Sequence, residues 1–260
     1  MNDASPNPSM TWYHLTEITF SRVAMKSALD TSRSDATSTH ERVYQGLRQR
    51  LLTGGFLPGR SVTLRGIANQ LNVSPMPVRD AVRRLIAERA LEMQDNRRVL
   101  VPAMTMEKFD QIVFARQMLE LELARRAFDG IDAGKLAWID KVDESMNPSL
   151  HTGDIEGYMR GNYEFHFSIY RCANSGMLLA MLESVWLQFA PFMRVVYGRL
   201  GTEAMTDEHV AARRALRDRN RDALLAAISA DIMQGMRIIG REVLSGRPPT
   251  TSKSVDRPKA

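Results

Sequence analysis

The sequence has little cysteine, no long run of apolar residues and no glycine-rich phosphate loop. Its one cysteine, Cys172, excludes a disulfide framework and is typical of a protein that stays in a reducing cytoplasm. No apolar run approaches the roughly 20 residues of a membrane span, and no basic segment with a cleavage site indicates a signal peptide. The HExxH pattern of metalloproteases and a Ser/His/Asp pattern are also missing. We therefore expect a cytoplasmic protein that is neither membrane-bound nor a hydrolase.

The basic residues are concentrated in one segment of the chain. The 260 residues have a net charge of +5 and an apolar content of 44%, which is ordinary for a soluble protein with material for two cores. Residues 37–105 hold 11 basic and 5 acidic side chains, whereas residues 106–260 hold 21 of each. Phosphate binding predicts such a concentration, and a uniformly soluble surface does not. The basic segment is therefore a candidate for contact with nucleic acid.

Residues 61–91 have the pattern of two short amphipathic helices joined by a tight turn. In the first helix, apolar residues at i, i+3, i+4 and i+7 share one face, and they are Leu64, Ile67, Ala68 and Leu71. The second helix, Ser74–Arg89, begins with a serine N-cap whose hydroxyl can accept from the first turn, followed by two prolines. Several arginines lie outside the apolar face of this helix, and a guanidinium there can form hydrogen bonds with a guanine edge or a phosphate. This predicts a helix-turn-helix with Ser74–Arg89 as the recognition helix; a solvated basic helix is the alternative.

The flanking residues complete a winged helix. A helix is predicted over His40–Thr53, and short β patterns over Glu92–Gln94 and Val99–Val101 enclose an arginine-bearing turn, the predicted wing. An ordinary polar turn is the alternative, but beside a recognition helix we favour a contact with phosphate or the minor groove. The residues predicted to contact DNA are Arg65, Ser74, Met76, Arg79, Arg83, Arg84, Arg97 and Arg98.

The remainder of the chain is helical in pattern. Helices are predicted over residues 107–129, 135–146, 153–173, 176–197, 205–217 and 221–244, with a kink at Pro191. The predicted fold class is thus mainly α: an N-terminal winged helix-turn-helix domain plus a C-terminal antiparallel all-α bundle. The expected domains are a flexible arm with a short helix near residues 17–29, the DNA-binding domain, the helical domain and a flexible tail, over residues 1–38, 39–104, 105–246 and 247–260.

Two stretches, VYQGLRQRLLTGGFLPG and LRGIANQLNVSPMPVRDAVRRLIAERALE, resemble the N-terminal domain of the GntR family of bacterial transcription regulators. Two positions depart from the family pattern, because Pro75 stands where arginine is usual and Arg98 stands where the wing usually has glycine. The helical part resembles the FCD effector domain of the FadR branch in its motifs RQMLE, N-x-x-F-H, NSGML, EH and DALLA, in that order. The resemblance implies a homodimeric repressor that reads an inverted-repeat operator and responds to a small-molecule effector, expected to be an organic acid.

The FCD resemblance also implies a metal site. Members of this branch commonly hold a divalent metal through one aspartate and three histidines, and the matching positions here are Asn162, His166, His209 and Asp231. The first two lie at i and i+4 and so share a helical face. Two imidazoles, one carboxylate and an amide oxygen could hold zinc, nickel or manganese.

Several alternatives remain open for these residues and for the chain. A metal-free pocket could grip an organic anion through Arg116, Tyr163, His166 and His209 by charge-assisted hydrogen bonds, or the histidines could be structural. Arg116 and Glu120, at i and i+4, could equally form a helix-surface ion pair, and the many methionines leave an apolar effector open. The helical part could instead belong to a metal-dependent enzyme, or the regulator could have no ligand.

Overall fold

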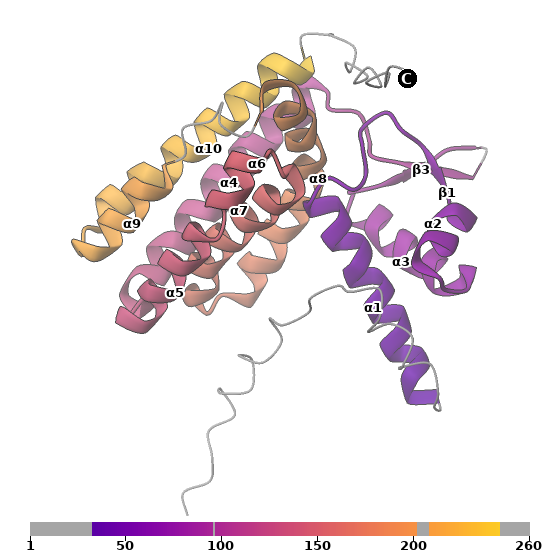
Figure 1. Ribbon diagram of the computed structural model, residues 1–260, viewed down its shortest axis with the longest axis horizontal. Coiled ribbons are helices and arrows are strands. Elements are labelled where there is room, and N and C mark those ends of the chain that lie inside the picture. The colour runs from indigo at the N-terminus through magenta and orange to yellow at the C-terminus, as the bar shows by residue number, and fades with distance from the viewer. Residues whose placement is uncertain (1–32, 96, 202–207, 245–260) are drawn as a thin grey trace, which may run out of the picture. The chain divides into compact units, whose positions relative to one another are not determined.

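The computed structural model describes residues 33–95, 97–201 and 208–244 (Figure 1). Residues 1–32, which hold most of the predicted arm and its helix at residues 17–29, lie outside the described residues. The predicted tail over residues 247–260 lies outside them as well. The first described helix, α1, spans Arg33–Leu52 and begins earlier than the predicted start at His40. The described chain is mainly helical, with one small antiparallel sheet in its N-terminal part, which confirms the predicted fold class.

The N-terminal part is a winged helix-turn-helix. After α1 its elements are β1, α2, α3, β2 and β3, which span Val62–Thr63, Leu64–Leu71, Pro75–Ala87, Glu92–Met93 and Arg98–Leu100. The strands form one antiparallel sheet in the order β1-β3-β2, in which Val62 pairs with Val99 and Glu92 pairs with Leu100. The predicted hairpin is therefore present. The strand β1 is an addition to the prediction, because two residues are too few to show an alternating pattern.

The second helix of the motif is held by a buried face and a defined turn. The buried residues of α3 are Pro77, Val78, Ala81, Val82 and Leu85. The last four belong to a core shared with α1, α2 and β3. Asn72 closes the turn before it, with the left-handed backbone angles φ 54° and ψ 46°. Ser74 is the N-cap residue, as predicted, but its hydroxyl makes no capping hydrogen bond. The third helical position is Pro77, which has no N–H to donate to that hydroxyl.

The C-terminal part is an all-helical bundle, and Figure 1 shows its long helices side by side. The α-helices α4 to α10 span Met106–Ala127, Ala133–Glu144, Asn147–Thr152, Ile155–Tyr170, Gly176–Leu200, His209–Arg217 and Arg221–Leu244. Short 3-10 turns, η2 and η3, follow α4 and α7 at Phe128–Gly130 and Arg171–Ala173. Three helices begin where a side chain accepts from the first turn, at Thr105, Asp132 and Asp154. The short α6 is an addition to the predicted set, and α8 continues through Pro191 to Leu200.

Two bundle helices, α8 and α10, have the length and composition of a membrane span, with a mean hydropathy of 1.3 over 18 residues. The sequence predicted no unbroken apolar run of that length, but a mean over 18 residues tolerates the charged side chains that interrupt such a run, such as Glu183 in α8 and Asp231 in α10. Both helices bury large side chains, such as Trp186 and Ile232, in the core of the bundle. Since buried core helices pass the same test, composition alone is weak support for a membrane segment.

Candidate functional site

All eight side chains predicted to contact DNA are exposed, and they lie on α2, on α3 and on the hairpin. Arg79 and Arg83 project from α3 outside its buried face. Arg97, at the tip of the hairpin, has a φ of 59°. Arg98 donates through Nε to the Ser61 hydroxyl (2.7 Å), which ties β3 to the residue before β1. The exposed arginines thus lie on the recognition helix, on the helix before it and on the wing.

Arg84 differs from Arg83, which lies 3.9 Å from Asp80, because its guanidinium makes a hydrogen bond and stacks on a ring. Its Nη1 donates to Glu41 Oε2 (2.7 Å), and its Cζ lies 3.4 Å from the centre of the Tyr44 ring. The Tyr44 hydroxyl donates in turn to Glu88 at the end of α3. These contacts join the C-terminal half of α3 to α1, so a contact between Arg84 and DNA stays a prediction.

Two histidines and one aspartate meet inside the helical bundle. His166 of α7, His209 of α9 and Asp231 of α10 each offer one possible ligand atom, and these atoms all lie within 4.8 Å of one another. The two imidazoles are 1% exposed and the Asp231 side chain is 18% exposed. We refer to these three residues as the His–Asp cluster. Three helices that are separate in the sequence therefore bring their polar groups to one buried point.

The contact between His166 and Asp231 is close but unusual. Nε2 of His166 lies 3.2 Å from Oδ2 of Asp231, yet within the described ranges this nitrogen has no partner in hydrogen-bond geometry. Burial opposes the ionisation of Asp231, but His166, His209 and Arg116 outweigh it and hold the pKa of Asp231 well below its usual range. A ring nitrogen so close to an ionised carboxylate needs a positive group between them, either a proton or a metal ion.

A buried chain of hydrogen bonds supports His166 from its other side. The Glu120 carboxylate accepts from Arg116 Nε (2.6 Å), Trp186 Nε1 (3.2 Å) and the Tyr170 hydroxyl (2.7 Å). The Tyr170 oxygen lies 3.2 Å from Nδ1 of His166. Burial and the Glu120 carboxylate raise the pKa of Tyr170 well above its usual range, so its hydroxyl stays protonated. The Arg116–Glu120 pair therefore lies in the core, 4% and 0% exposed, and not on the helix surface.

A second carboxylate, on α5, supports His209. Oδ1 of Asp143 lies 2.8 Å from Nδ1 of His209, and Oδ2 of Asp143 accepts from Arg213. Burial opposes the ionisation of Asp143, but the hydrogen bonds from His209 and Arg213 outweigh it and lower its pKa. Asp140, one turn earlier on the same helix, accepts from Arg213 (2.6 Å) and Arg217 (2.7 Å). Each imidazole of the cluster thus has its own supporting group at Nδ1.

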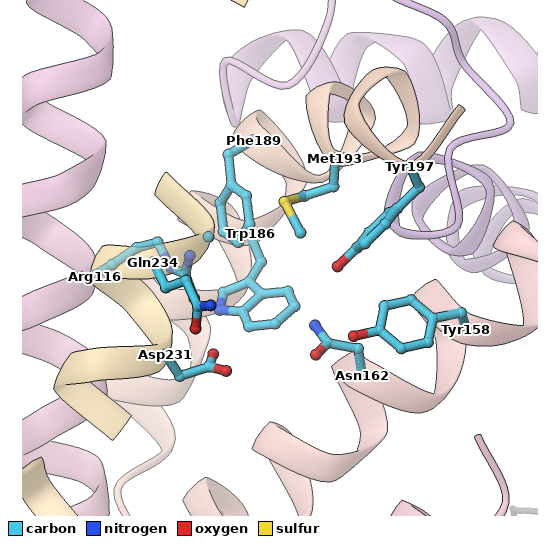
Figure 2. A pocket seen from close by; sticks show the side chains of 10 residues that line it. Arg116, Tyr158, Asn162, Trp186, Phe189, Met193, Tyr197, Asp231 and Gln234 are labelled. Atoms are coloured by element: carbon cyan, nitrogen blue, oxygen red, sulfur yellow. The ribbon is translucent and has the colours of Figure 1, made fainter. Parts of the chain in front are cut away.

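A small cavity of about 20 Å³ adjoins the cluster, with room for about one water molecule. Figure 2 shows Asp231 and Asn162 on opposite sides of this cavity, below the ring of Trp186. Of the predicted ligand and effector residues, Asn162, Asp231 and Arg116 line it, whereas Tyr163 packs with the ring of Trp186. The remaining lining residues are Tyr158, Trp186, Phe189, Met193, Tyr197, Gln234 and Gly235.

Sequence reasoning missed most of the residues that support the cluster or line its cavity, among them Tyr170, Trp186, Asp143 and Gln234. Tyr170 follows His166 by four residues, as His166 follows Asn162, so helical spacing alone could have indicated it. The contacts of Asp143 with His209 and of Trp186 with Glu120 each span 66 residues. No local pattern signals contacts of that length.

Two family models match the chain. The model of bacterial regulatory proteins, gntR family, matches residues 39–101, and the model of the FCD domain matches residues 111–233. The HTH-type transcriptional regulator McbR of Escherichia coli (strain K12) is 27% identical over 202 residues, which cover 78% of this chain and 87% of that protein. The gluconate operon transcriptional repressor of Bacillus subtilis (strain 168) is 27% identical over 157 residues, 60% of this chain and 62% of that protein.

Two solved structures share the fold. E. coli McbR/YncC has a TM-score of 0.72 with this chain at 24% identity, over 78% of this chain and 97% of that one. A transcriptional regulator GntR from Rhodococcus sp. RHA1 has a TM-score of 0.65 at 22% identity, over 81% and 100% of the two chains. At these identities the likeness concerns the fold alone.

Proposed function

Since this chain belongs to the GntR family of bacterial regulatory proteins and carries an FCD domain, we propose that it is a repressor whose operator affinity is set by a small organic acid. Membership of the family makes it a DNA-binding transcription regulator and not an enzyme. The observation that carries the proposal is the buried His–Asp cluster beside a cavity in the FCD domain. The proposal includes a divalent metal on this cluster and a homodimer on an operator of two inverted half-sites.

The exposed arginines support the reading of DNA by α3. Arg79 and Arg83 lie on its exposed side, and a guanidinium can form two parallel hydrogen bonds with a guanine or a phosphate. The wing adds Arg97 and Arg98 for contacts with the backbone or the minor groove. Two such helices related by a two-fold axis would read half-sites about one helical turn apart.

The donor set of the His–Asp cluster fits a divalent transition metal. His166, His209 and Asp231 would supply two imidazole nitrogens and one carboxylate oxygen, and the amide of Asn162 lines the same cavity. Zinc, nickel and manganese all accept such nitrogen and oxygen ligands. Neighbouring ligand atoms of a tetrahedral zinc ion lie roughly 3.4 Å apart, so separations near the cluster's limit of 4.8 Å would shorten by up to about 1.4 Å when the ion binds. When bound, the metal would supply the positive charge that the buried His166–Asp231 contact requires.

The charge balance of the cavity favours an organic anion once a metal is present. Arg116 lines the cavity, but Glu120 neutralises its guanidinium, which stacks 4.2 Å from the centre of the Phe189 ring. Asp231 adds a negative charge to the same cavity. A divalent ion would reverse this balance and attract a carboxylate. We therefore favour a metal-assisted pocket over the metal-free pocket that the sequence left open.

The size of the cavity supports a coupling between effector and DNA. With room for about one water molecule, it admits a larger effector only after the bundle widens. Met193 borders the cavity, and its unbranched side chain can change shape at little cost. A ligand that prefers the wider state shifts the protein toward that state, and this differential affinity is what regulation requires.

Replacing Asp231 with alanine is expected to lower the affinity for zinc at least about 100-fold, because changes to supporting residues alone cost 10–100-fold. Calorimetric titration with zinc measures the change, and Asp222→Ala, an exposed residue in the first turn of the same helix, is the matched control. In the zinc-loaded wild type, one member of a panel of organic acids should alter operator affinity in a fluorescence anisotropy titration. Asp231→Ala should abolish that response.

Two results would count against this part of the proposal. If the wild type binds neither zinc, nickel nor manganese, the metal has no role. If the zinc-loaded wild type has one operator affinity across the whole panel, the effector is not an organic acid of the tested kinds.

An exposed apolar face on α4 supports the homodimer. Phe114 is 69% exposed and Met118 is 58% exposed, one helical turn apart. Two copies of α4 packed antiparallel about a two-fold axis near Met118 would place Phe114 opposite Leu121 and Asp110 opposite Arg125 of the other copy. The pairing buries apolar side chains and matches opposite charges.

Replacing Phe114 with aspartate is therefore expected to weaken the dimer by about a hundredfold or more, because each copy loses the burial of a phenyl ring, about 1.5–3 kcal/mol. Sedimentation velocity across a concentration series measures the dissociation. Met177→Asp, at a 74% exposed position on α8, is the control and should leave the dimer intact. A Phe114→Asp variant that stays dimeric at the wild-type concentration would place the interface elsewhere.

A further inference from the structure

Both imidazoles of the His–Asp cluster are held through the same ring atom. Nδ1 of His166 faces the Tyr170 hydroxyl (3.2 Å), and Nδ1 of His209 faces the Asp143 carboxylate (2.8 Å). Nε2 of His166 is the atom that faces Asp231. Asp143 contacts Nδ1 of His209, so Nε2 is the nitrogen of that ring that can serve as a metal ligand. The supporting groups therefore act on the side of each ring away from the cluster.

The direction of the hydrogen bonds around Tyr170 decides the tautomer of His166. An ionised carboxylate only accepts, so in the 2.7 Å contact the single hydroxyl proton of Tyr170 goes to Glu120. The Tyr170 oxygen can then only accept from His166, which requires the ring proton on Nδ1. With a metal ion on the cluster the ring is neutral and has one N–H, so the lone pair of Nε2 is then the one that faces the ion beside Asp231.

The same reasoning applies to His209. Asp143 is an acceptor, its Oδ2 takes a hydrogen bond from Arg213, and its Oδ1 is left for Nδ1 of His209. This contact also requires the proton on Nδ1. The side chain of Arg213 is 15% exposed, so it holds the Asp143 carboxylate in place from the edge of the bundle.

We infer that Tyr170 and Asp143 are positioning residues that fix both imidazoles as Nδ1–H tautomers, so that two Nε2 lone pairs are directed at one metal ion. The inference rests on the proposed metal and adds which nitrogen of each ring the chain offers to the ion. Glu120 orients Tyr170 by accepting its proton, and Arg213 orients Asp143. Supporting hydrogen bonds of this kind change metal affinity 10–100-fold.

The test combines zinc calorimetry with a spectroscopic measurement on the full chain. Tyr170→Phe and Asp143→Ala should each lower zinc affinity about 10-fold or more. Asp140→Ala removes a carboxylate that shares Arg213 and should stay within about twofold of the wild type. Asp143→Asn should restore part of the loss, because its amide oxygen can still accept from Nδ1. Thermal melts verify that each variant is folded. If Tyr170→Phe does not fold, the comparison of Asp143→Ala with Asp143→Asn tests the inference.

Long-range proton–nitrogen spectra of zinc-loaded protein labelled with ¹⁵N-histidine report the tautomers directly. Protons on Nδ1 of both His166 and His209 support the inference, and a proton on Nε2 of either ring overturns it. If the wild type binds zinc and the positioning variants bind it as tightly, the inference is wrong while the metal site stands. If the wild type binds no zinc at all, the proposed metal falls and the inference falls with it.

Discussion

Replacing Arg79 with alanine is expected to weaken operator binding by roughly 30-fold to 20,000-fold. A guanidinium paired with a base edge contributes about 1–3 kcal/mol, a dimer presents it twice, and each 1.4 kcal/mol is a factor of ten. Arg79 is exposed near the start of α3, where a recognition helix meets the bases. The fold should be unaffected, because the buried face of α3 is made by other residues, among them Val78 and Val82.

The measurement is a fluorescence anisotropy titration on a duplex selected from random DNA by the wild-type protein, repeated at several salt concentrations. Arg160→Ala, which removes an exposed arginine of α7 that pairs with Glu156, is the matched control and should leave the affinity unchanged. Full affinity in a folded Arg79→Ala variant would show that α3 does not read the operator through this residue.

Replacing Glu120 with alanine is expected to destabilise the protein by about 3–5 kcal/mol. Glu120 is 0% exposed and accepts hydrogen bonds from Arg116, Trp186 and Tyr170. Its removal leaves the guanidinium of Arg116 charged, 4% exposed and without its carboxylate. An uncompensated buried charge is among the most costly changes in a protein core. For a chain of this size the melting temperature should fall by roughly 6–20 °C.

Two controls distinguish the effect of leaving a buried charge unpaired from the effect of removing any carboxylate. Glu122→Ala, on the same helix, removes a partner of the exposed Arg125 and Arg126 and should leave the melting temperature close to that of the wild type. The double replacement of Arg116 by methionine and Glu120 by leucine should recover most of the stability, because no buried charge remains. Calorimetric melts measure all three, and a Glu120→Ala variant that melts within about 2 °C of the wild type would contradict the argument.

The fold could be predicted closely wherever the signal is local. The helices α2, α3 and α10 start or end within a few residues of the predicted positions, because their apolar residues recur at helical spacing. The two-residue strand β1 and the six-residue α6 fall below the length at which a pattern is visible. Residues 202–207, where the predicted start of α9 falls, lie outside the described residues.

The candidate site was predictable only in part, for a related reason. Asn162 and His166 share a helix, so their spacing is visible, and His209 and Asp231 came from the resemblance to a family. The burial of Arg116 with Glu120 is not visible, because an i, i+4 pair has the same spacing in the core as on the surface. The partner of each imidazole comes from packing: Tyr170 is placed by the Glu120 contact across 50 residues.

The contacts between α3 and α1 affect how loss-of-function mutations in such a regulator should be interpreted. Glu41 and Tyr44, which belong to α1, contact Arg84 and Glu88 at the C-terminal end of the recognition helix α3. A genetic screen for strains that lose control of the target genes will therefore recover changes at Glu41 or Tyr44 beside changes at the arginines themselves. Such alleles tilt the helix rather than remove a base contact, so they lower occupancy of every site without altering which site is preferred.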